Sequence, residues 1–237
     1  MAAPVALVTG GGKRVGATLV RTLAARGFSV AVHYHSSRQE AEALATSLGN
    51  GARAFCANLA DPAAPSRLIG EVVAALGGLD VLVNSAASFL RTPLDRVTTA
   101  DWDAVFAVNL RAPFFLSIEA AKHMTETGVI INIADLAAFE GWPNYVPHGA
   151  AKAGVVQITR ALARQLAPRI RVNAIVPGVV LLPEGTTAQE SGRLAATTPL
   201  RRHGTPVDVA RAMTYLLDAT FVTGELLFVD GGRHVRV

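Results

Sequence analysis

Cysteine, lysine and aromatic residues are scarce in this sequence of 237 residues. The single cysteine, Cys56, excludes an internal disulfide bond and a metal cluster held by several thiolates. Its place in the apolar run 52–57 predicts a small buried side chain. Aromatic residues make up 6% of the chain and hydrophobic residues 51%, so we expect an aliphatic core. Lysine occurs only at positions 13, 122 and 152, which draws attention to each of them.

Long apolar runs and charge clusters are also missing. No apolar run reaches the ~20 residues that a membrane-spanning helix needs, and the first residues lack a signal-peptide pattern. The formal net charge is +4, and the basic residues are scattered rather than gathered into a run suited to nucleic acid or a membrane surface. We therefore expect a cytoplasmic protein that binds a small molecule, and neither nucleic acid, membrane nor metal.

Apolar runs of strand length alternate with stretches of helical periodicity along the chain. Strands that are apolar throughout are buried on both faces, as in a parallel sheet covered by helices. The pattern predicts an α/β fold: one Rossmann-like domain over residues 1–237, with a doubly wound parallel sheet of about seven strands and helices on both faces. The expected strands are 5–8, 28–34, 52–57, 81–84, 129–133, 172–176 and 226–229, and the expected helices 14–26, 37–48, 62–76, 99–125, 148–167 and 206–218.

The stretch 177–206 shows no clear periodicity and is long for a connection between elements. Long irregular segments in compact domains usually serve as lids or as substrate-binding loops. We therefore predict a substrate loop at about 177–206.

The turn after the first expected strand is rich in glycine and carries two cations. Its sequence is Thr9-Gly10-Gly11-Gly12-Lys13-Arg14-Val15-Gly16. The N–H groups of such a turn can close on a pyrophosphate, and the N-terminus of the following helix adds partial positive charge. A tight connection would use similar glycines, but packing gives little reason for two cations. We predict a dinucleotide bound by Gly10, Lys13, Arg14, Val15 and Gly16.

Residues after the second and third expected strands predict which dinucleotide binds. An acidic residue would bind the ribose hydroxyls of NAD, and none occurs here before Glu40. Hydroxyl, imidazole and guanidinium groups favour the 2′-phosphate of NADP instead, with His33, Tyr34, His35 and Ser36 as its candidate ligands. The alternative is a solvated loop whose serines cap the next helix. Further along, Asn58 and Leu59 suit the adenine edge, or a plain turn.

Small and polar residues follow the fourth expected strand. Asn84, Ser85 and Ala86 leave room for a flat cofactor ring close to the backbone. Phe89 comes next, at the mouth of the predicted cleft, either to stack on an aromatic substrate or to join the core. Asn109 interrupts an apolar helical stretch and, if buried, needs polar partners. It either holds the helix backbone open around a water or pairs locally.

A carboxylate, an imidazole and an ammonium group follow the fifth expected strand. Asp135 comes first, and His148 and Lys152 are spaced four apart at a helix start, so that they share one helix face. Convergence of the three groups would form a proton-transfer cluster. A surface ion pair beside an unrelated histidine is the alternative.

These motifs together resemble the short-chain dehydrogenase/reductase family, over nearly the whole chain. The similar segments are the Thr9 to Gly16 turn, Asn84-Ser85-Ala86, Asn109, Lys152, Pro177-Gly178 and Asp230-Gly231-Gly232. The resemblance implies NADP as the cofactor, with Lys152, Pro177 and Gly178 also among its contacts. It also implies catalytic roles for Asn109 and Lys152, and a homotetramer formed through the helices at about 99–125 and 148–167 and the C-terminal tail.

Within the family, several features are similar to the pteridine reductase and dihydromonapterin reductase branch. They are the Gly-Lys-Arg-x-Gly turn, the His33 to Ser36 stretch, Ser88-Phe89, Asp135 in place of the usual serine, and the tail from Phe221 to His234. This likeness implies reduction of a pterin or folate by NADPH. It also implies that Arg14 contacts pterin and phosphate, and that Phe89 sandwiches the pterin against the nicotinamide.

One residue departs from the family pattern. The active-site tyrosine of the family stands four residues before the lysine, and this chain has His148 there. Tyr145 lies three residues too early to take the same place on the helix. We therefore predict that His148, oriented by Asp135, donates the proton, or that Asp135 donates it through a water. A carbonyl reductase and a catalytically impaired NADP-binding protein are the alternative functions.

Overall fold

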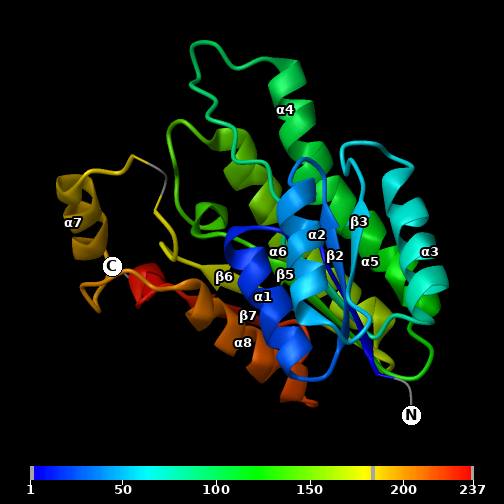
Figure 1. Cartoon of the computed structure of the whole chain (residues 1–237). Coiled ribbons are helices and arrows are strands. Elements are labelled where there is room, and N and C mark those ends of the chain that lie inside the picture. The colour runs from blue at the N-terminus through cyan, green and yellow to red at the C-terminus, as the bar shows by residue number, and fades with distance from the viewer. Residues whose placement is uncertain (1–2, 183–184, 236–237) are drawn as a thin grey trace.

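A seven-stranded parallel sheet organises the chain in the computed structural model, which describes residues 3–182 and 185–235 (Figure 1). The strand order is β3-β2-β1-β4-β5-β6-β7, and every neighbouring pair is parallel. The predicted α/β fold is confirmed, because all seven expected strands are present within two residues of their expected bounds. These strands are β1 (Val5–Val8), β2 (Ser29–Tyr34), β3 (Arg53–Cys56), β4 (Val81–Asn84), β5 (Gly128–Ile133), β6 (Ile170–Pro177) and β7 (Leu226–Val229).

Helices cover both faces of the sheet. One face carries α1 (Arg14–Ala25), α2 (Arg38–Leu48) and α8 (Pro206–Asp218), whose aliphatic side chains share a core with β1 and β2. The other face carries α3 (Ala64–Leu76), α5 (Ala112–His123) and α6 (Val146–Leu166). Both faces of the central strands are thus shielded from solvent, which explains why the sequences of those strands are continuous apolar runs.

The order of the strands creates a crevice at one edge of the sheet. The chain moves from β1 outward to β2 and β3, and then returns to the other side of β1 with β4. Ligands in such sheets bind beyond the carboxyl ends of the strands, at the point where the direction reverses. The loops after β1, β4 and β5 therefore meet there, as the sequence predicts.

The last crossover has the opposite hand to the first. Helix α8 connects β6 to β7, and helix α1 connects β1 to β2. Both helices lie on the same face of the sheet and pack against each other, but the two connections cross the sheet in opposite directions. Nearly all crossovers of this kind are right-handed. The exception carries the segment after β6 across the carboxyl edge, where a substrate would lie.

Two expectations about local structure need correction. The stretch 177–206 is not irregular throughout, because it contains α7 (Ala188–Ala196), which begins with a capping box between Thr187 and Glu190. This helix stands off from the sheet, and none of its residues is fully buried (Figure 1). The other correction concerns Cys56, which is exposed at the end of the edge strand β3.

The helix expected at 99–125 is not uniform. It consists of α4 (Thr99–Phe106), a π-helical turn η1 (Ala107–Arg111) and α5. Together, Thr99–His123 are long and apolar enough to cross a membrane, contrary to the expectation that no stretch would be. Half of the apolar window is buried within the protein, however, and Leu116 and Ala120 of α5 lie in the core. The apolar character is explained by this packing.

A buried polar network ties the sheet to the helices beneath the crevice. Asn84 Nδ2 donates to Asn132 Oδ1 over 2.9 Å and to Ser117 Oγ over 3.2 Å, and Asn132 Nδ2 donates to Thr159 Oγ1 over 2.9 Å. All four side chains are buried. Because buried polar groups need partners, the network fixes the relative positions of β4, β5, α5 and α6.

Candidate active site

The glycine turn after β1 is shaped for close approach of a ligand. Gly10 has φ +64°, and a Cβ atom on it would lie 3.0 Å from the Ala86 backbone. A Cβ atom on Gly16 would lie only 2.2 Å from Gly10 O. Helix α1 begins here with no side-chain cap and no acidic residue in its first turn. An uncapped helix N-terminus attracts anions, so the turn fits the pyrophosphate of a dinucleotide.

His33 supports the glycine turn through hydrogen bonds to the main chain, and its ring nitrogens are not available to a ligand. It is buried, its Nδ1 accepts from Gly10 N–H over 3.0 Å, and its Nε2 lies 3.0 Å from Ala57 O. The neutral Nε2–H tautomer satisfies both contacts. Burial lowers the pKa of His33 from 6.5 to about 4. The predicted role as a phosphate donor is therefore replaced by a structural one, since main-chain groups occupy both ring nitrogens.

Two cations stand at the mouth of the turn. Lys13 and Arg14 are exposed, and Arg14 has φ +52°, a left-handed conformation unfavourable for a residue with a Cβ atom. Lys13 Nζ lies 2.5 Å from Glu40 Oε1, and this hydrogen bond is the main cause of the lowered pKa of Glu40. Val15 is half-buried behind them.

Residues placed at the adenosine end are found in different environments. His35 and Ser36 are exposed after β2, whereas the Tyr34 side chain is buried. Burial is the main cause of the raised pKa of Tyr34. Ser37 is the N-cap residue of α2 but makes no side-chain cap bond, so capping does not explain the serines. Asn58 forms a turn by accepting from Ala60 N–H. Leu59 packs in the core, so it can offer a ligand its backbone alone.

The hydroxyl of Thr9, in the loop after β1, binds the backbone of the loop after β4. Thr9 Oγ1 accepts from Ser85 N–H over 2.9 Å and from Ala86 N–H over 3.0 Å. Thr9 is not among the predicted site residues; its position directly after the first strand is the sequence feature that could have identified it.

At the far end of the crevice, Gly178 N–H donates to Val229 O, and a Cβ atom on Gly178 would lie 2.8 Å from the Asp230 Cα atom. Pro177, the last residue of β6, is half-buried beside it.

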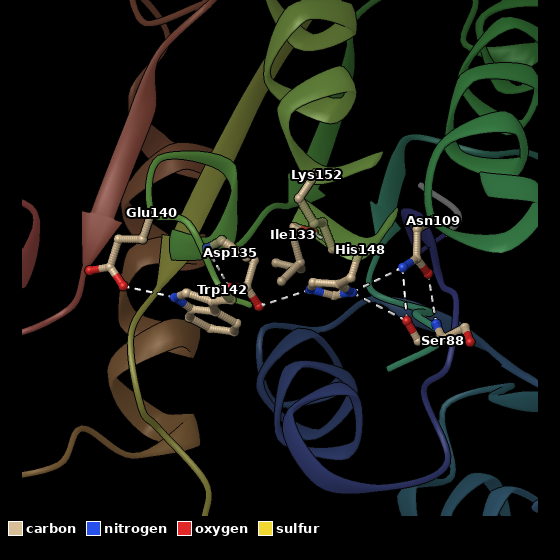
Figure 2. Close-up of polar contacts among 9 residues, drawn as sticks. Ser88, Asn109, Ile133, Asp135, Glu140, Trp142, His148 and Lys152 are labelled. Carbon is tan, nitrogen blue, oxygen red and sulfur yellow. Dashed lines mark hydrogen bonds and ion pairs between the residues drawn. The ribbon is translucent and has the colours of Figure 1, made fainter. Parts of the chain in front are cut away.

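The predicted proton-transfer residues do converge (Figure 2). His148 Nε2 lies 3.4 Å from Asp135 Oδ2, and His148 Nδ1 lies 3.1 Å from Asn109 Nδ2. His148 is buried in the first turn of α6, and the Asp135 side chain is 26% exposed after β5. A surface ion pair is thus wrong for this cluster, since its histidine is inside the protein.

Asn109 comes to the cluster from the π-helical turn η1. Its Oδ1 accepts from Ser88 N–H over 2.7 Å, and its Nδ2 donates to Ser88 O over 2.8 Å and faces His148 Nδ1. The helix widens into a π-helical turn at Asn109, and the Asn109 amide contacts the Ser88 backbone and the His148 ring; a water in the widened turn stays a prediction. The Ser88 carbonyl, which also lies 3.3 Å from His148 Nδ1, was not among the predicted site groups.

These contacts define the state of the His148 ring. The Asn109 amide can only donate through Nδ2, and an ionised Asp135 can only accept. The neutral imidazole therefore carries its proton on Nε2 and accepts at Nδ1. In the imidazolium form, the Ser88 carbonyl is the acceptor available to Nδ1–H.

Lys152 lies one turn further along α6 and is buried. Its Nζ donates to Ile133 O, at the end of β5, over 2.6 Å. Burial lowers the pKa of Lys152 from 10.5 to about 8, and the Asp135 carboxylate partly opposes this shift. The ammonium group is thus held at the strand end that faces the crevice.

Phe89 belongs to an aromatic cluster beside His148 and not to the core. It is 53% exposed, stacks on Tyr145 with ring centroids 4.5 Å apart, and meets the His148 ring edge-on at 4.9 Å. Trp142 meets both Phe89 and Tyr145 edge-on at 6.4 Å. Tyr145 is the N-cap residue of α6 and lies outside the helix face that carries His148 and Lys152.

Comparison with known proteins identifies the family of this chain. The family model described as enoyl-(acyl carrier protein) reductase matches residues 12–234. The 3-oxoacyl-(acyl-carrier-protein) reductase FabG of Staphylococcus aureus is 34% identical over 97% of this chain and 98% of its own length. This chain belongs to the short-chain dehydrogenase/reductase family. It is therefore an oxidoreductase by family, and His148 is its departure from the family's active-site tyrosine.

Two solved structures superimpose closely on this chain. A blue fluorescent protein from a metagenomic library, crystallised with NADPH, has a TM-score of 0.92 and 37% identity, with 97% of both chains covered. The FolM alternative dihydrofolate reductase 1 of Brucella canis, crystallised with NADP, has a TM-score of 0.93 and 32% identity, with 100% of this chain and 96% of that chain covered.

The His33 clamp predicts a loss of stability in mild acid. The folded-state pKa of about 4 lies below 6.5, so the unfolded chain binds the extra proton between these values. Stability from this group is complete above pH ~6.5 and declines as the pH falls toward ~4, by about 2 kcal/mol between pH ~7 and pH ~5. Urea unfolding of the wild type and of His33→Leu at both pH values measures this.

His33→Leu should be less stable than the wild type at pH ~7, because Gly10 N–H and Ala57 O lose their partner, but should lose less on acidification. His123→Gln, which changes an exposed histidine, is the matched control. Equal acid sensitivity in the wild type and in His33→Leu would show that His33 is not the group responsible.

Proposed function

We propose that this short-chain reductase uses NADPH to transfer hydride to the C=N bond of a dihydropterin or dihydrofolate. The observation that carries the proposal is the His148–Asp135 pair next to the exposed ring of Phe89. The pair offers a proton, and the ring offers a flat apolar surface for a planar heterocycle. The similarity to FolM dihydrofolate reductases supports the same substrate class.

The cofactor site is assigned to the glycine turn and the loops after β2, β3, β4 and β6. Lys13, Arg14, His35 and Ser36 are the exposed donors for the phosphates, and Arg14 would also reach the pterin. Asn84, Ser85, Ala86, Pro177 and Gly178 would hold the nicotinamide half of the cofactor, and Lys152 would bind the nicotinamide ribose. When bound, NADPH supplies the hydride. The NADPH-bound and NADP-bound relatives support this choice of cofactor.

His148 is assigned as the proton donor. As the C=N bond is reduced, the Nε2–H of the imidazolium would give its proton to the nitrogen of that bond. Directly after this transfer the ring has its other proton on Nδ1, where the Ser88 carbonyl accepts it, until Nε2 is protonated again; the Nε2–H tautomer is the neutral form of the resting site. Asp135, partly exposed, orients Nε2 and connects it with solvent for reprotonation. Proton transfer of this kind contributes about 10²–10⁴-fold to the rate.

Replacement of tyrosine by histidine suits this chemistry. A free imidazolium titrates near ~6.5 and a phenol near ~10, so the imidazolium is the stronger acid. Reduction of a C=N bond protonates a nitrogen and generates no alkoxide, so a phenol held beside an ammonium group is not needed. Carbonyl reduction depends more strongly on that arrangement.

A carbonyl substrate is the second candidate function. It is favoured by one observation: the curated relatives with 34% identity include FabG and a putative ketoacyl reductase from Streptomyces violaceoruber. A 3-oxoacyl thioester would then take the place of the pterin, and His148 would protonate the carbonyl oxygen. A catalytically impaired NADP-binding protein would bind the cofactor and reduce neither class.

Subunit association is a further part of the proposal. A largely apolar groove of about 750 Å³ lies between α4, η1, α5 and α6, and its apolar lining includes Phe106, Leu110, Phe114 and Ile158. These are the helices through which the family resemblance implies a homotetramer. We assign the groove to that interface.

The phosphate site predicts selectivity for NADPH over NADH. Lys13→Gln should weaken NADPH binding about tenfold and NADH binding much less. The substitution removes a positive charge beside the 2′-phosphate, which NADH lacks. Glu40→Gln should strengthen NADPH binding, since Lys13 is then free of its carboxylate partner. Isothermal titration calorimetry measures both, and equal losses for the two coenzymes in Lys13→Gln would contradict this assignment.

The proton donor is tested by NADPH oxidation with dihydrofolate, dihydrobiopterin and dihydromonapterin. His148→Ala should lower kcat by about 10²–10⁴-fold with little change in NADPH affinity, and Asp135→Asn should have a smaller effect on kcat. His148→Tyr should move the pH dependence of kcat upward, because a phenol keeps its proton to higher pH than an imidazolium.

The outcomes separate the candidate functions. Undiminished turnover in His148→Ala would remove His148 from the mechanism. Turnover of 3-oxoacyl thioesters without turnover of any pterin would establish the carbonyl reductase. NADPH binding with neither activity would identify the impaired protein.

A further inference from the structure

The C-terminal segment reaches the aromatic cluster through one ion pair. Arg233, in the short turn η3 (Arg233–Val235), donates from Nε to Glu140 Oε1 over 2.8 Å and from Nη2 to Glu140 Oε2 over 2.6 Å. The two side chains are only 15% and 28% exposed. A bidentate, largely buried pair holds both partners in one geometry, which an exposed single contact does not.

The same carboxylate holds the indole of Trp142. Trp142 Nε1 donates to Glu140 Oε2 over 2.8 Å (Figure 2). The indole also packs edge-on against Phe89 and Tyr145. In the view of Figure 2, Glu140 and Trp142 lie beyond Asp135, on the side away from Asn109. Trp142 is thus fixed at its polar end by Glu140, and its rings face the cluster that borders His148.

Arg233 also joins a third segment. Its Nη1 donates to Thr197 Oγ1 over 3.3 Å, and Thr197 is the C-cap residue of α7 in the segment assigned to the substrate. The turn that carries Arg233 is itself fixed, because Asp230 accepts from Gly232 N–H and from His234 N–H. One guanidinium therefore connects the C-terminal segment, the loop after β5 and the segment after β6.

We propose that the Arg233–Glu140 pair positions Trp142 as the outer wall of the substrate end of the site, and so determines the affinity for a planar substrate. Arg233 is a positioning residue, since it acts through Glu140 and Trp142 and not on the reacting atoms. The substrate class rests on the proposed function, whereas the placement of Trp142 does not. Loss of the pair should loosen the indole and leave the glycine turn and the His148–Asp135 contact unchanged.

The first test observes Trp142 without any substrate. The chain has two tryptophans, so Trp102→Phe leaves Trp142 as the sole emitter. In this background, Arg233→Met should shift the emission to longer wavelength and lower its anisotropy, and Arg233→Lys should give an intermediate change. Arg26→Met is the matched control, because it breaks another two-contact ion pair, with Asp218, at the opposite edge of the sheet, where α1 ends.

The second test is kinetic. Arg233→Met should raise the KM for the best pterin about tenfold, with kcat changed less than about threefold and NADPH affinity unchanged, because binding of the substrate ring is lost while the reacting groups stay in place. Glu140→Gln should reproduce the effect and provides a second route if Arg233→Met does not fold. A general structural role would instead lower kcat and NADPH affinity together.

The results decide the proposal in each case. Unchanged Trp142 emission in both Arg233→Met and Glu140→Gln would overturn it, and so would altered emission with an unchanged KM. A parallel loss of kcat and cofactor affinity would also overturn it. If the wild type reduces no pterin, the proposed function fails, and the fluorescence of Trp142 alone then decides whether Arg233 positions the wall.

Discussion

The site depends on the hydrogen bonds of one buried amide, that of Asn109. This side chain binds both backbone groups of Ser88 and faces His148 Nδ1, so it joins the loop after β4 to the first turn of α6. The π-helical turn Ala107–Arg111 brings the amide to this point, and such turns are frequent at functional sites. Its removal would take a hydrogen-bond partner from the part-buried Ser88 N–H and from the buried His148 ring, and an unsatisfied buried polar group costs about 1–3 kcal/mol.

Two histidines at the same edge of the sheet have different surroundings, and we propose different roles for them. His33 is enclosed by Gly10 N–H and Ala57 O, and burial lowers its pKa to about 4, so it remains neutral and supports the phosphate turn. His148 has one nitrogen toward a partly exposed carboxylate and the other toward an amide and a carbonyl. This is the ring that we propose as the proton donor.

The sequence was sufficient for the sheet and for the convergence of Asp135, His148 and Lys152, because apolar runs identify buried strands and strand ends share one edge. It was insufficient where the surroundings decide the role of a residue. His33 looks like a phosphate ligand until its burial is known, and Cys56 looks buried until β3 is seen at the edge of the sheet. The Arg233–Glu140 pair spans 93 residues of sequence, and no local pattern indicates a contact of that range.

The central claim is that Asn109 and Asp135 hold His148 with its proton on Nε2, ready for the substrate. Nitrogen NMR of the protein labelled in its six histidines measures this directly, with His148→Gln identifying the signals of that ring. The account predicts that neutral His148 shows a protonated Nε2 and an unprotonated Nδ1, and that Asn109→Ala weakens this preference. A neutral His148 protonated on Nδ1 in the wild type would contradict it.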